Sequence, residues 1–504
     1  MNQKTNAQSS SGNVLNIANA GALLPIQGVC YTPTPSDDTP SPPQKYFDSD
    51  FTNSDFPLLW GTANGGRGDI NSLSSGVGVN FVHLYNWSVP PAPGQQPGDY
   101  ERSHLSFLAE CAANNVKVFV PISNYFLEQL NQGNTATVTA QVTAMVTEIY
   151  NGGTTPNPGA GIWGIGNEYD LAGGLFTVTD VVNMIAILLA AETSLNIPAQ
   201  ALLPITVPVS FADPTGANTP AIVALQNLQT ALAANPATAN VWTTRFIASM
   251  NPFNDGTYLA NYISTTFPNA FPNTPFFFTE MGTAIQAGTP VTTEAQQAAY
   301  VQAQLLSARA QGNFMGACVF QNLDQSAVKS GSEATFGMTK YATPPSCTTG
   351  TIPAGYVPGG GDTYNVDVLT QKPLYQSVQG VYMGTILANR TWHNTNVNVD
   401  PSTTVTISCT GGAWTADPHD NGGQLYSAAG DPTIVVTQPG YPLMGAPMGA
   451  LVGRVGSQVF LVGMGTTVPA TASGVLELCI NDDLNHIYGS GLADNIGGVF
   501  VSIS

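Results

Sequence analysis

Two glutamates end apolar segments in a chain that uses charge sparingly. Glu168 ends the run GIWGIGNE and Glu280 ends the run TPFFFTE, while only 9% of the 504 residues are charged. Two carboxyl groups that face each other can cleave a glycosidic bond: one protonates the leaving oxygen, and the other attacks the anomeric carbon or activates water. A single Glu in such a place is as often a helix N-terminal residue, favoured by the helix dipole. Two of them, with Asn167 directly before Glu168, favour the catalytic interpretation.

The segments that carry these glutamates belong to a regular alternation over about the first 380 residues. Eight short apolar segments, rich in β-branched and aromatic residues, predict strands, and helix-like segments lie between them. This alternation predicts a (β/α)8 TIM barrel over 23–384, after a flexible segment 1–22. In such a barrel the chemistry lies at the C-terminal ends of the strands, where Glu168 and Glu280 fall. The predicted strands lie within 26–33, 78–87, 116–123, 161–168, 202–210, 245–253, 274–282 and 314–322.

The Asn-Glu pair on the fourth predicted strand and the Glu on the seventh resemble the clan A glycoside hydrolases. The resemblance implies that Glu168 is the acid/base, Glu280 the nucleophile and Asn167 the partner of the sugar 2-hydroxyl. It also implies retention of anomeric configuration, with the carboxyl groups about 5–5.5 Å apart, and no cofactor for catalysis. The segments 56–86 and 104–122 loosely resemble β-1,3-glucanosyltransferases. Transfer to a sugar therefore stays open beside hydrolysis of a β-glycan.

Aromatic and amide side chains at other strand ends are candidates for binding the sugar. Aromatic faces pack against the apolar faces of sugar rings, and amides meet hydroxyl groups. The alternative for each residue is packing beneath the barrel mouth. The candidates are Tyr31, Tyr85, Asn86 and Trp87 after the first two strands, Asn251 after the sixth, and Gln321 and Asn322 after the eighth.

The last 120 or so residues have a different character. The segment 341–365 is rich in Pro, Gly and Thr and predicts a loop, and 371–383 predicts the closing helix of the barrel. From residue 385 on, helical periodicity is absent and short strands alternate with Gly, Asn, Asp and Pro turns. This pattern predicts an all-β antiparallel sandwich over 385–504. Its predicted strands lie at 403–409, 433–438, 449–456, 458–463, 474–480 and 498–503.

Three stretches of this region, 404–418, 445–463 and 480–503, resemble the PA-IL-like galactose-binding lectin domain. The resemblance implies a Ca²⁺ bound by the side chains of Asp482, Asp494 and Asn495 and by the backbone carbonyl of Asp417. Oxygen ligands of this kind suit Ca²⁺, although Asp and Asn also build turns. The loop between Asp482 and Asp494 is longer than in that family, and its galactose-contacting His and Gln have no clear counterparts. The sugar site is therefore changed or vestigial.

Composition narrows the remaining possibilities. A net charge of −19 argues against nucleic acid, and no apolar run is long enough for membrane insertion. Low Lys content and many Asn, Thr and Gly residues suggest an extracellular or cell-surface protein, without a recognisable signal peptide. The six cysteines form no CxxC pair, and a disulfide between Cys409 and Cys479 stays open. The expected partner is an oligo- or polysaccharide, with a homo-oligomer through the lectin-like domain as a further expectation. The alternative is a non-catalytic carbohydrate-binding or structural surface or fibre protein.

Overall fold

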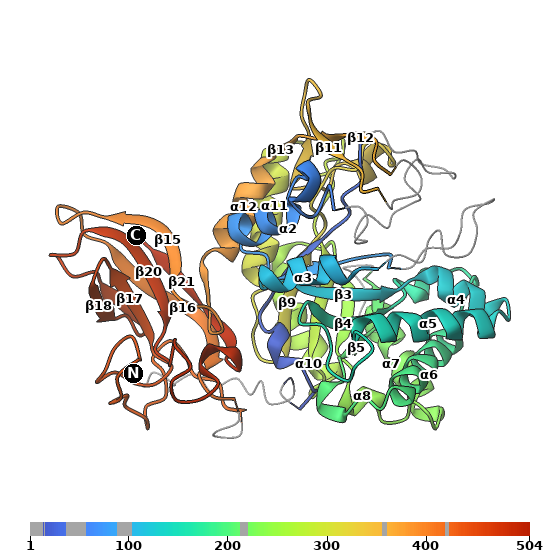
Figure 1. Ribbon diagram of the computed structural model, residues 1–504, viewed down its shortest axis with the longest axis horizontal. Coiled ribbons are helices and arrows are strands. Elements are labelled where there is room, and N and C mark those ends of the chain that lie inside the picture. The colour runs from blue at the N-terminus through green and yellow to red at the C-terminus, as the bar shows by residue number, and fades with distance from the viewer. Residues whose placement is uncertain are drawn as a thin grey trace.

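A parallel barrel and an antiparallel sandwich make up the computed structural model of the chain. It describes residues 14, 16–36, 57–87, 103–211, 220–354, 360–418 and 423–504. Figure 1 shows the sandwich, in orange and red, beside the barrel and its helices. No helix in these described ranges is long and apolar enough to cross a membrane.

The barrel is a parallel sheet in the order β5-β4-β3-β2-β1-β9-β8-β7-β6. The fifth expected strand is divided into β5 and β6, which lie on either side of Val207. Ile205 of β5 pairs with Phe246, two residues before β7 begins, so the two sheet edges meet and the ring is nearly closed. The fold class is confirmed. The strands are β1 (Ile26–Cys30), β2 (Phe81–His83), β3 (Lys117–Ile122), β4 (Ala160–Ile165), β5 (Ile205–Thr206), β6 (Pro208–Ser210), β7 (Ala248–Asn251), β8 (Phe276–Met281) and β9 (Phe314–Val319).

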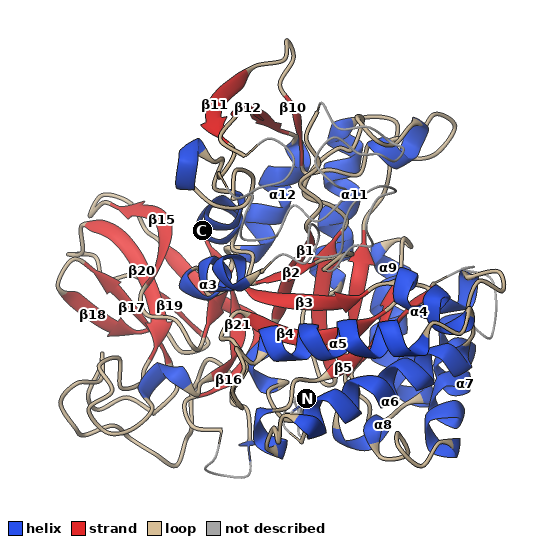
Figure 2. Ribbon diagram, turned by 45° about the vertical axis from the view of Figure 1, so that its right-hand side comes forward, coloured by secondary structure: helices blue, strands red, loops and turns tan. Residues whose placement is uncertain are grey.

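Helices cover the outside of the barrel (Figure 2). A capping box between Thr177 and Asp180 begins α6, and the Thr293 side chain caps α11. The helices are α2 (Asp69–Asn71), α3 (Leu105–Ala113), α4 (Asn124–Asn131), α5 (Thr135–Ile149), α6 (Val178–Ser194), α7 (Pro220–Ala234), α8 (Val241–Thr244), α9 (Gly256–Asn261), α10 (Phe267–Ala270), α11 (Glu294–Ser307) and α12 (Pro373–Tyr382).

Alternation along the strands divides the barrel core into two layers. Phe81, Phe119 and Phe277 belong to a buried cluster of strand residues inside the ring. Their neighbours in sequence, such as Val82 and Val118, belong to the larger cluster that packs against the helices. Successive strand side chains point to opposite faces, so one strand supplies both layers.

The segment 341–365, predicted as a loop, contains a strand that pairs with a later one, and this part of the prediction is wrong. β11 (Cys347–Thr351) pairs antiparallel with β12 (Thr363–Asp367), and β10 (Thr339–Tyr341) pairs with β13 (Leu369–Gln371). Tyr364 and Val366 of β12 are buried against Leu58 and Leu59. Contact with a segment distant in sequence thus orders a stretch whose local composition favours turns. The predicted closing helix is present as α12.

The sandwich consists of two four-stranded antiparallel sheets, β14-β21-β16-β19 and β15-β20-β17-β18. The expected strand at 433–438 is absent: one isolated bridge, Val435 to Pro447, is recorded there. Prolines at 432 and 439 flank that segment. The strands are β14 (Thr385–Leu387), β15 (His393–Val399), β16 (Thr406–Thr415), β17 (Leu451–Val455), β18 (Gln458–Leu461), β19 (Gly465–Thr467), β20 (Gly474–Ile480) and β21 (Ile496–Ile503).

Cys409 and Cys479 lie in opposite sheets of this sandwich, on β16 and β20. All six cysteines of the chain, these two included, are free thiols. The sandwich core is therefore held by packing around Trp414, Leu451 and Leu478, all fully buried.

The sandwich contacts the barrel at the N-terminal ends of the barrel strands. Gln27 of β1 donates from Nε2 to Thr385 Oγ1 at 3.0 Å, and Gly497 N donates to Leu24 O at 3.1 Å. This contact leaves the opposite end of the barrel, where the strands finish, away from the sandwich.

Candidate active site

The turn after β4 holds the Asn-Glu pair in a defined backbone conformation. Gly166 and Glu168 both have positive φ, 62° and 52°. Asn124, at the start of α4, accepts from Asn167 N at 2.7 Å and donates from Nδ2 to Asn167 O at 3.0 Å. Glu168 N donates to Pro208 O of β6 at 2.9 Å. Three elements therefore fix the direction in which this pair projects from the strand end.

Glu280 lies near the end of β8 and is only 6% exposed. Its Oε1 accepts from Tyr85 Oη at 2.8 Å and from Asn167 Nδ2 at 3.3 Å. Burial raises the pKa of Glu280 to about 7, and the Glu168 carboxylate adds to this rise. The hydrogen bonds from Tyr85 and Asn167 oppose it, because they favour the charged form.

Glu168 is half-buried and takes its hydrogen bond from Asn251, at the end of β7. Asn251 Nδ2 donates to Glu168 Oε1 at 2.9 Å and to Asn167 Oδ1 at 3.1 Å. Thr279 Oγ1 in turn donates to Asn251 Oδ1 at 2.8 Å, which fixes the orientation of the amide. Burial raises the pKa of Glu168, the Asn251 hydrogen bond lowers it, and the charge of Asp170 raises it further.

A chain of hydrogen bonds therefore runs from Glu168 through Asn251 and Asn167 to Glu280. The structure brings together four residues that the sequence indicated on three different strands. The sequence led us to expect an ionised Glu280 and a protonated Glu168. The structure instead raises the pKa of both carboxyl groups, since both lie in an environment that disfavours charge.

A cavity of about 240 Å³ lies beside the carboxyl groups, at the ends of β2, β3 and β4. Tyr85 and Asn86 line it, as expected for sugar-binding residues, together with Tyr125 and Asn167. His83 forms part of its base and burial lowers the His83 pKa to about 3, so that this ring is neutral. The cavity thus offers ring faces and amides beside Asn167, which bonds to Glu280.

The structure buries two of the expected sugar contacts. Trp87 is fully buried: its ring stacks on His104 at 4.1 Å and its Nε1 donates to Glu148 at 3.0 Å. Tyr31 is 2% exposed and donates to Asp69 Oδ2 at 3.0 Å. Both rings follow a strand end but turn into the packing layer outside the barrel. Position in a strand does not by itself fix the direction of a side chain.

The candidates after the eighth strand have structural partners. Gln321 Oε1 accepts from Thr32 Oγ1 and Asn322 Oδ1 accepts from Thr32 N, both at 2.9 Å. They join the loops after β1 and β9. Asn124 and Tyr125 were missed, although they directly follow the third strand in PISNY. The rule that selected Asn86 after β2 applies equally to them.

Two of the expected calcium ligands, Asp482 and Asn495, contact each other in the sandwich. Asn495 Nδ2 donates to Asp482 Oδ2 at 2.8 Å, and both residues are buried. The charge of Asp494 raises the pKa of Asp482. The charges of Asp482 and Asp417 both raise the pKa of Tyr441. Within the described part of the chain, no group of three His, Cys, Asp or Glu side chains is arranged to hold a metal ion.

Comparison with known proteins finds no matching family model and no matching curated protein. Solved structures with a similar course of the chain are glycoside hydrolases. A GH2 β-galacturonidase from Eisenbergiella tayi bound to galacturonate is 14% identical with a TM-score of 0.41, over 71% of this chain and 51% of that one. A plant β-glucan endohydrolase is 16% identical with a TM-score of 0.37, over 54% of this chain and 91% of that one. A β-glucuronidase from Faecalibacterium prausnitzii is 15% identical with a TM-score of 0.34, over 54% and 42%.

The chain thus spans about half the length of the β-galacturonidase that it matches. At these identities the likeness concerns the fold alone. The function proposed next rests on the geometry of the carboxyl groups.

Proposed function

We propose that the protein is a retaining glycoside hydrolase or transglycosylase that acts on a β-glycan. The observation that carries the proposal is the hydrogen-bonded link between Glu168 and Glu280. Asn251 donates to Glu168 and to Asn167, and Asn167 donates to Glu280. The half-exposed Tyr85 and Asn86 in the adjoining cavity support a carbohydrate substrate.

In the first step, the Glu280 carboxylate attacks the anomeric carbon while the glycosidic C–O bond breaks. Glu168 gives its proton to the leaving oxygen. In the second step, the Glu168 carboxylate takes a proton from water or from a sugar hydroxyl as that oxygen attacks the anomeric carbon. The bond to Glu280 then breaks and its carboxylate is restored. Each step leaves one of the two groups charged.

Asymmetric hydrogen bonding supports this assignment of roles. Glu280 Oε1 accepts two hydrogen bonds, from Tyr85 and Asn167, whereas one is recorded to Glu168, from Asn251. Donors stabilise a carboxylate. These two donors favour the ionised form of Glu280, against the burial that raises its pKa to about 7.

Kinetics on aryl β-glycosides with good and poor leaving groups, beside a reduced β-1,3-glucan, test the proposal. Glu280→Gln should abolish turnover of all of them, because no covalent intermediate forms. Glu168→Gln should slow poor leaving groups by about 10²–10⁴-fold and good ones far less, because good ones need little protonation. The surface variant Glu294→Gln serves as control. Small and equal losses in both site variants would contradict the assignment, and a wild-type chain inert on every glycan would favour the structural alternative.

We further propose that the sandwich binds Ca²⁺ and holds the enzyme on a glycan. Asn495 Oδ1 is buried and has no hydrogen-bond partner, and it lies on a side chain bonded to Asp482. A buried carboxylate beside a buried unpartnered amide oxygen fits a hard cation. Asp482 and Asn495 would supply side-chain oxygens, with Asp494 and the Asp417 carbonyl as further ligands. The bound ion would supply charge that lowers the pKa of Asp482, now raised by burial.

A further inference from the structure

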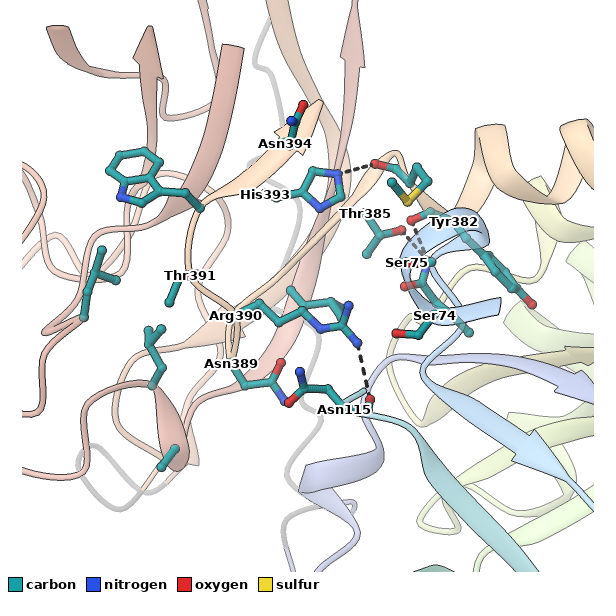
Figure 3. Close-up of a pocket in the computed structure, with 18 of the residues that line it drawn as sticks. Ser74, Ser75, Asn115, Tyr382, Thr385, Asn389, Arg390, Thr391, His393 and Asn394 are labelled. Carbon is teal, nitrogen blue, oxygen red and sulfur yellow. Dashed lines mark hydrogen bonds between the residues drawn. The ribbon is translucent and has the colours of Figure 1, made fainter. Parts of the chain in front are cut away.

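A cleft of about 580 Å³ lies between the barrel and the sandwich, in the size range of small-molecule sites. Figure 3 shows Ser74, Ser75 and Asn115 on its barrel side and Asn389, Arg390 and His393 on its sandwich side. The barrel residues Gln27 and Asn115 lie at the N-terminal ends of β1 and β3. The cleft is therefore at the opposite end of the barrel from Glu168 and Glu280.

The charge of the cleft is opposite to that of the protein. The chain has 31 acidic residues against 12 Lys and Arg, yet no Asp or Glu is among the described residues that line this cleft. Arg390 is the cationic residue in the lining. Burial lowers the pKa of His393, and the Arg390 charge contributes, so His393 is neutral near pH 7. An anion would meet one guanidinium and no carboxylate.

The Arg390 guanidinium has hydrogen-bond capacity to spare. Its Nη2 donates to Asn115 O at 3.3 Å, across the cleft (Figure 3). Its Nε is buried without an acceptor in the described part of the chain. Burial lowers the pKa of Arg390, and no carboxylate stands among the groups that influence it. A buried donor without an acceptor costs free energy, and a planar guanidinium matches a carboxylate in two parallel hydrogen bonds.

The rest of the lining suits a hydroxylated ligand. Ser74 and Ser75 donate their hydroxyl protons to the backbone oxygens of Asn114 and Asn71, which leaves their oxygens free to accept. Asn389, Thr391 and Asn394 add amides and a hydroxyl. Trp392 adds an indole ring, and the Arg454 guanidinium, which pairs with Glu477, lies over that ring at 4.3 Å. One cation among neutral hydrogen-bonding groups and an aromatic ring is complementary to a sugar that carries a carboxylate.

We propose that this cleft binds an acidic saccharide, whose carboxylate pairs with Arg390 and whose hydroxyl groups contact the serine and asparagine side chains. The site does not depend on the activity of the barrel, because it shares no residue with the catalytic network. The cleft between the barrel and the sandwich would then attach the protein to a polymer that contains uronic acid.

Calorimetric titration of the full chain with a hexuronate, the matching neutral hexose and inorganic phosphate tests the proposal. Wild type should bind the hexuronate at least about tenfold more tightly than the hexose, since a charge-assisted pair distinguishes them. The preference should weaken as salt is added. Arg390→Gln should abolish the preference. Arg390→Lys should retain part of the preference, because lysine keeps the positive charge but cannot donate two parallel hydrogen bonds to a carboxylate.

Arg309→Gln is the matched control. Arg309 also joins the two parts of the molecule, over the Phe500 ring at 4.8 Å, but does not line the cleft. It should keep the preference even if the melting temperature falls. Equal binding of hexose and hexuronate, a preference that survives Arg390→Gln, or binding of phosphate alone would each overturn the proposal. Binding in the active site would survive Arg390→Gln and so is distinguished.

Discussion

Burial of Glu280 links the chemistry of the site to the stability of the fold. The carboxyl group is 6% exposed and its pKa is raised to about 7. In the unfolded chain its pKa would lie near the ordinary value of 4.5. Between these two values the folded state binds more protons than the unfolded state, so stability falls as pH rises through this window. The favourable contribution is present below about pH 4.5 and is lost above about pH 7.

We predict that Glu280→Gln stabilises the protein at high pH. A neutral amide keeps the hydrogen bond from Tyr85 and removes the cost of a buried charge. The gain in unfolding free energy should be about 3 kcal/mol larger at pH 8 than at pH 4. Denaturant titrations of wild type and variant at both values measure it. A gain that is the same at both values would contradict the raised pKa.

We predict that the Tyr85 hydroxyl positions the Glu280 carboxyl group and favours its ionised form. Tyr85→Phe keeps the ring and removes the donor to Glu280 Oε1, so the pKa of Glu280 should rise further. The acidic limb of the pH profile of kcat/KM should move up by about one pH unit. Tyr300→Phe, which removes a hydroxyl bonded to Phe253 O, should leave the limb in place. If Tyr85→Phe lowers the rate equally at every pH, the hydroxyl has a structural role only.

At the scale of elements, the turn after β4 determines where Asn167 and Glu168 point. A Cβ on Gly166 would meet Leu127 Cδ1 at 2.6 Å and Asn124 Oδ1 at 2.9 Å, and the residue has positive φ. Asn124 is the residue that brackets the Asn167 backbone. The fit of α4 against this turn therefore sets the position of Asn167 and Glu168 together.

We predict that Gly166→Ala reduces activity more than its effect on stability would explain. It should cost about 1–3 kcal/mol of unfolding free energy and lower kcat about tenfold or more by displacing Asn124. Gly173→Ala is matched, since Gly173 also has positive φ, at 60°, but a Cβ there would meet Leu171 O only at 4.0 Å. It should cost about 1 kcal/mol and leave kcat unchanged. Equal effects on kcat would show that backbone strain, rather than contact with α4, is responsible.

At the scale of the whole molecule, the sandwich docks on the end of the barrel opposite to Glu168 and Glu280. The contacts join Leu24 and Gln27 to Gly497 and Thr385. The barrel mouth and the proposed calcium site can therefore be perturbed separately. Ligand binding at one is expected to leave the chemistry at the other unchanged.

Calcium is predicted to stabilise the full chain without affecting hydrolysis. Adding Ca²⁺ after chelation should raise the melting temperature, by the equivalent of about 2.7 kcal/mol at about one hundred times Kd. It should also restore retention on an immobilised galactoside or a related glycan, while turnover of an aryl glycoside stays the same. Asp482→Asn should abolish both effects. Asp431→Asn, at a buried turn carboxylate bonded to Thr433, should keep them. No thermal shift in wild type would mean that these residues only build turns.

Much of this arrangement follows from the sequence, because it depends on local periodicity and on a rule about strand ends. Alternating short apolar runs and helices predict the barrel, and parallel pairing brings all C-terminal strand ends to one edge. This rule is sufficient to predict that Asn167, Glu168 and Glu280 lie at the same end of the barrel. Asn251 and Tyr85 were selected by the same rule, although the sequence assigned them to the sugar and the structure bonds them to the carboxyl groups.

Tertiary structure decided what depends on neighbours distant in the chain. Tyr31 and Trp87 follow strand ends as Tyr85 does, yet both are buried in the packing layer outside the barrel. There Tyr31 bonds to Asp69 and Trp87 bonds to Glu148. The pairing of β11 with β12 forms in a turn-rich stretch because Leu58 and Leu59 cover it. Asn124 contacts Asn167 because α4 packs against the turn after β4. The cleft around Arg390 has no signature in either half of the sequence, since its walls come from two parts that meet only in the folded molecule.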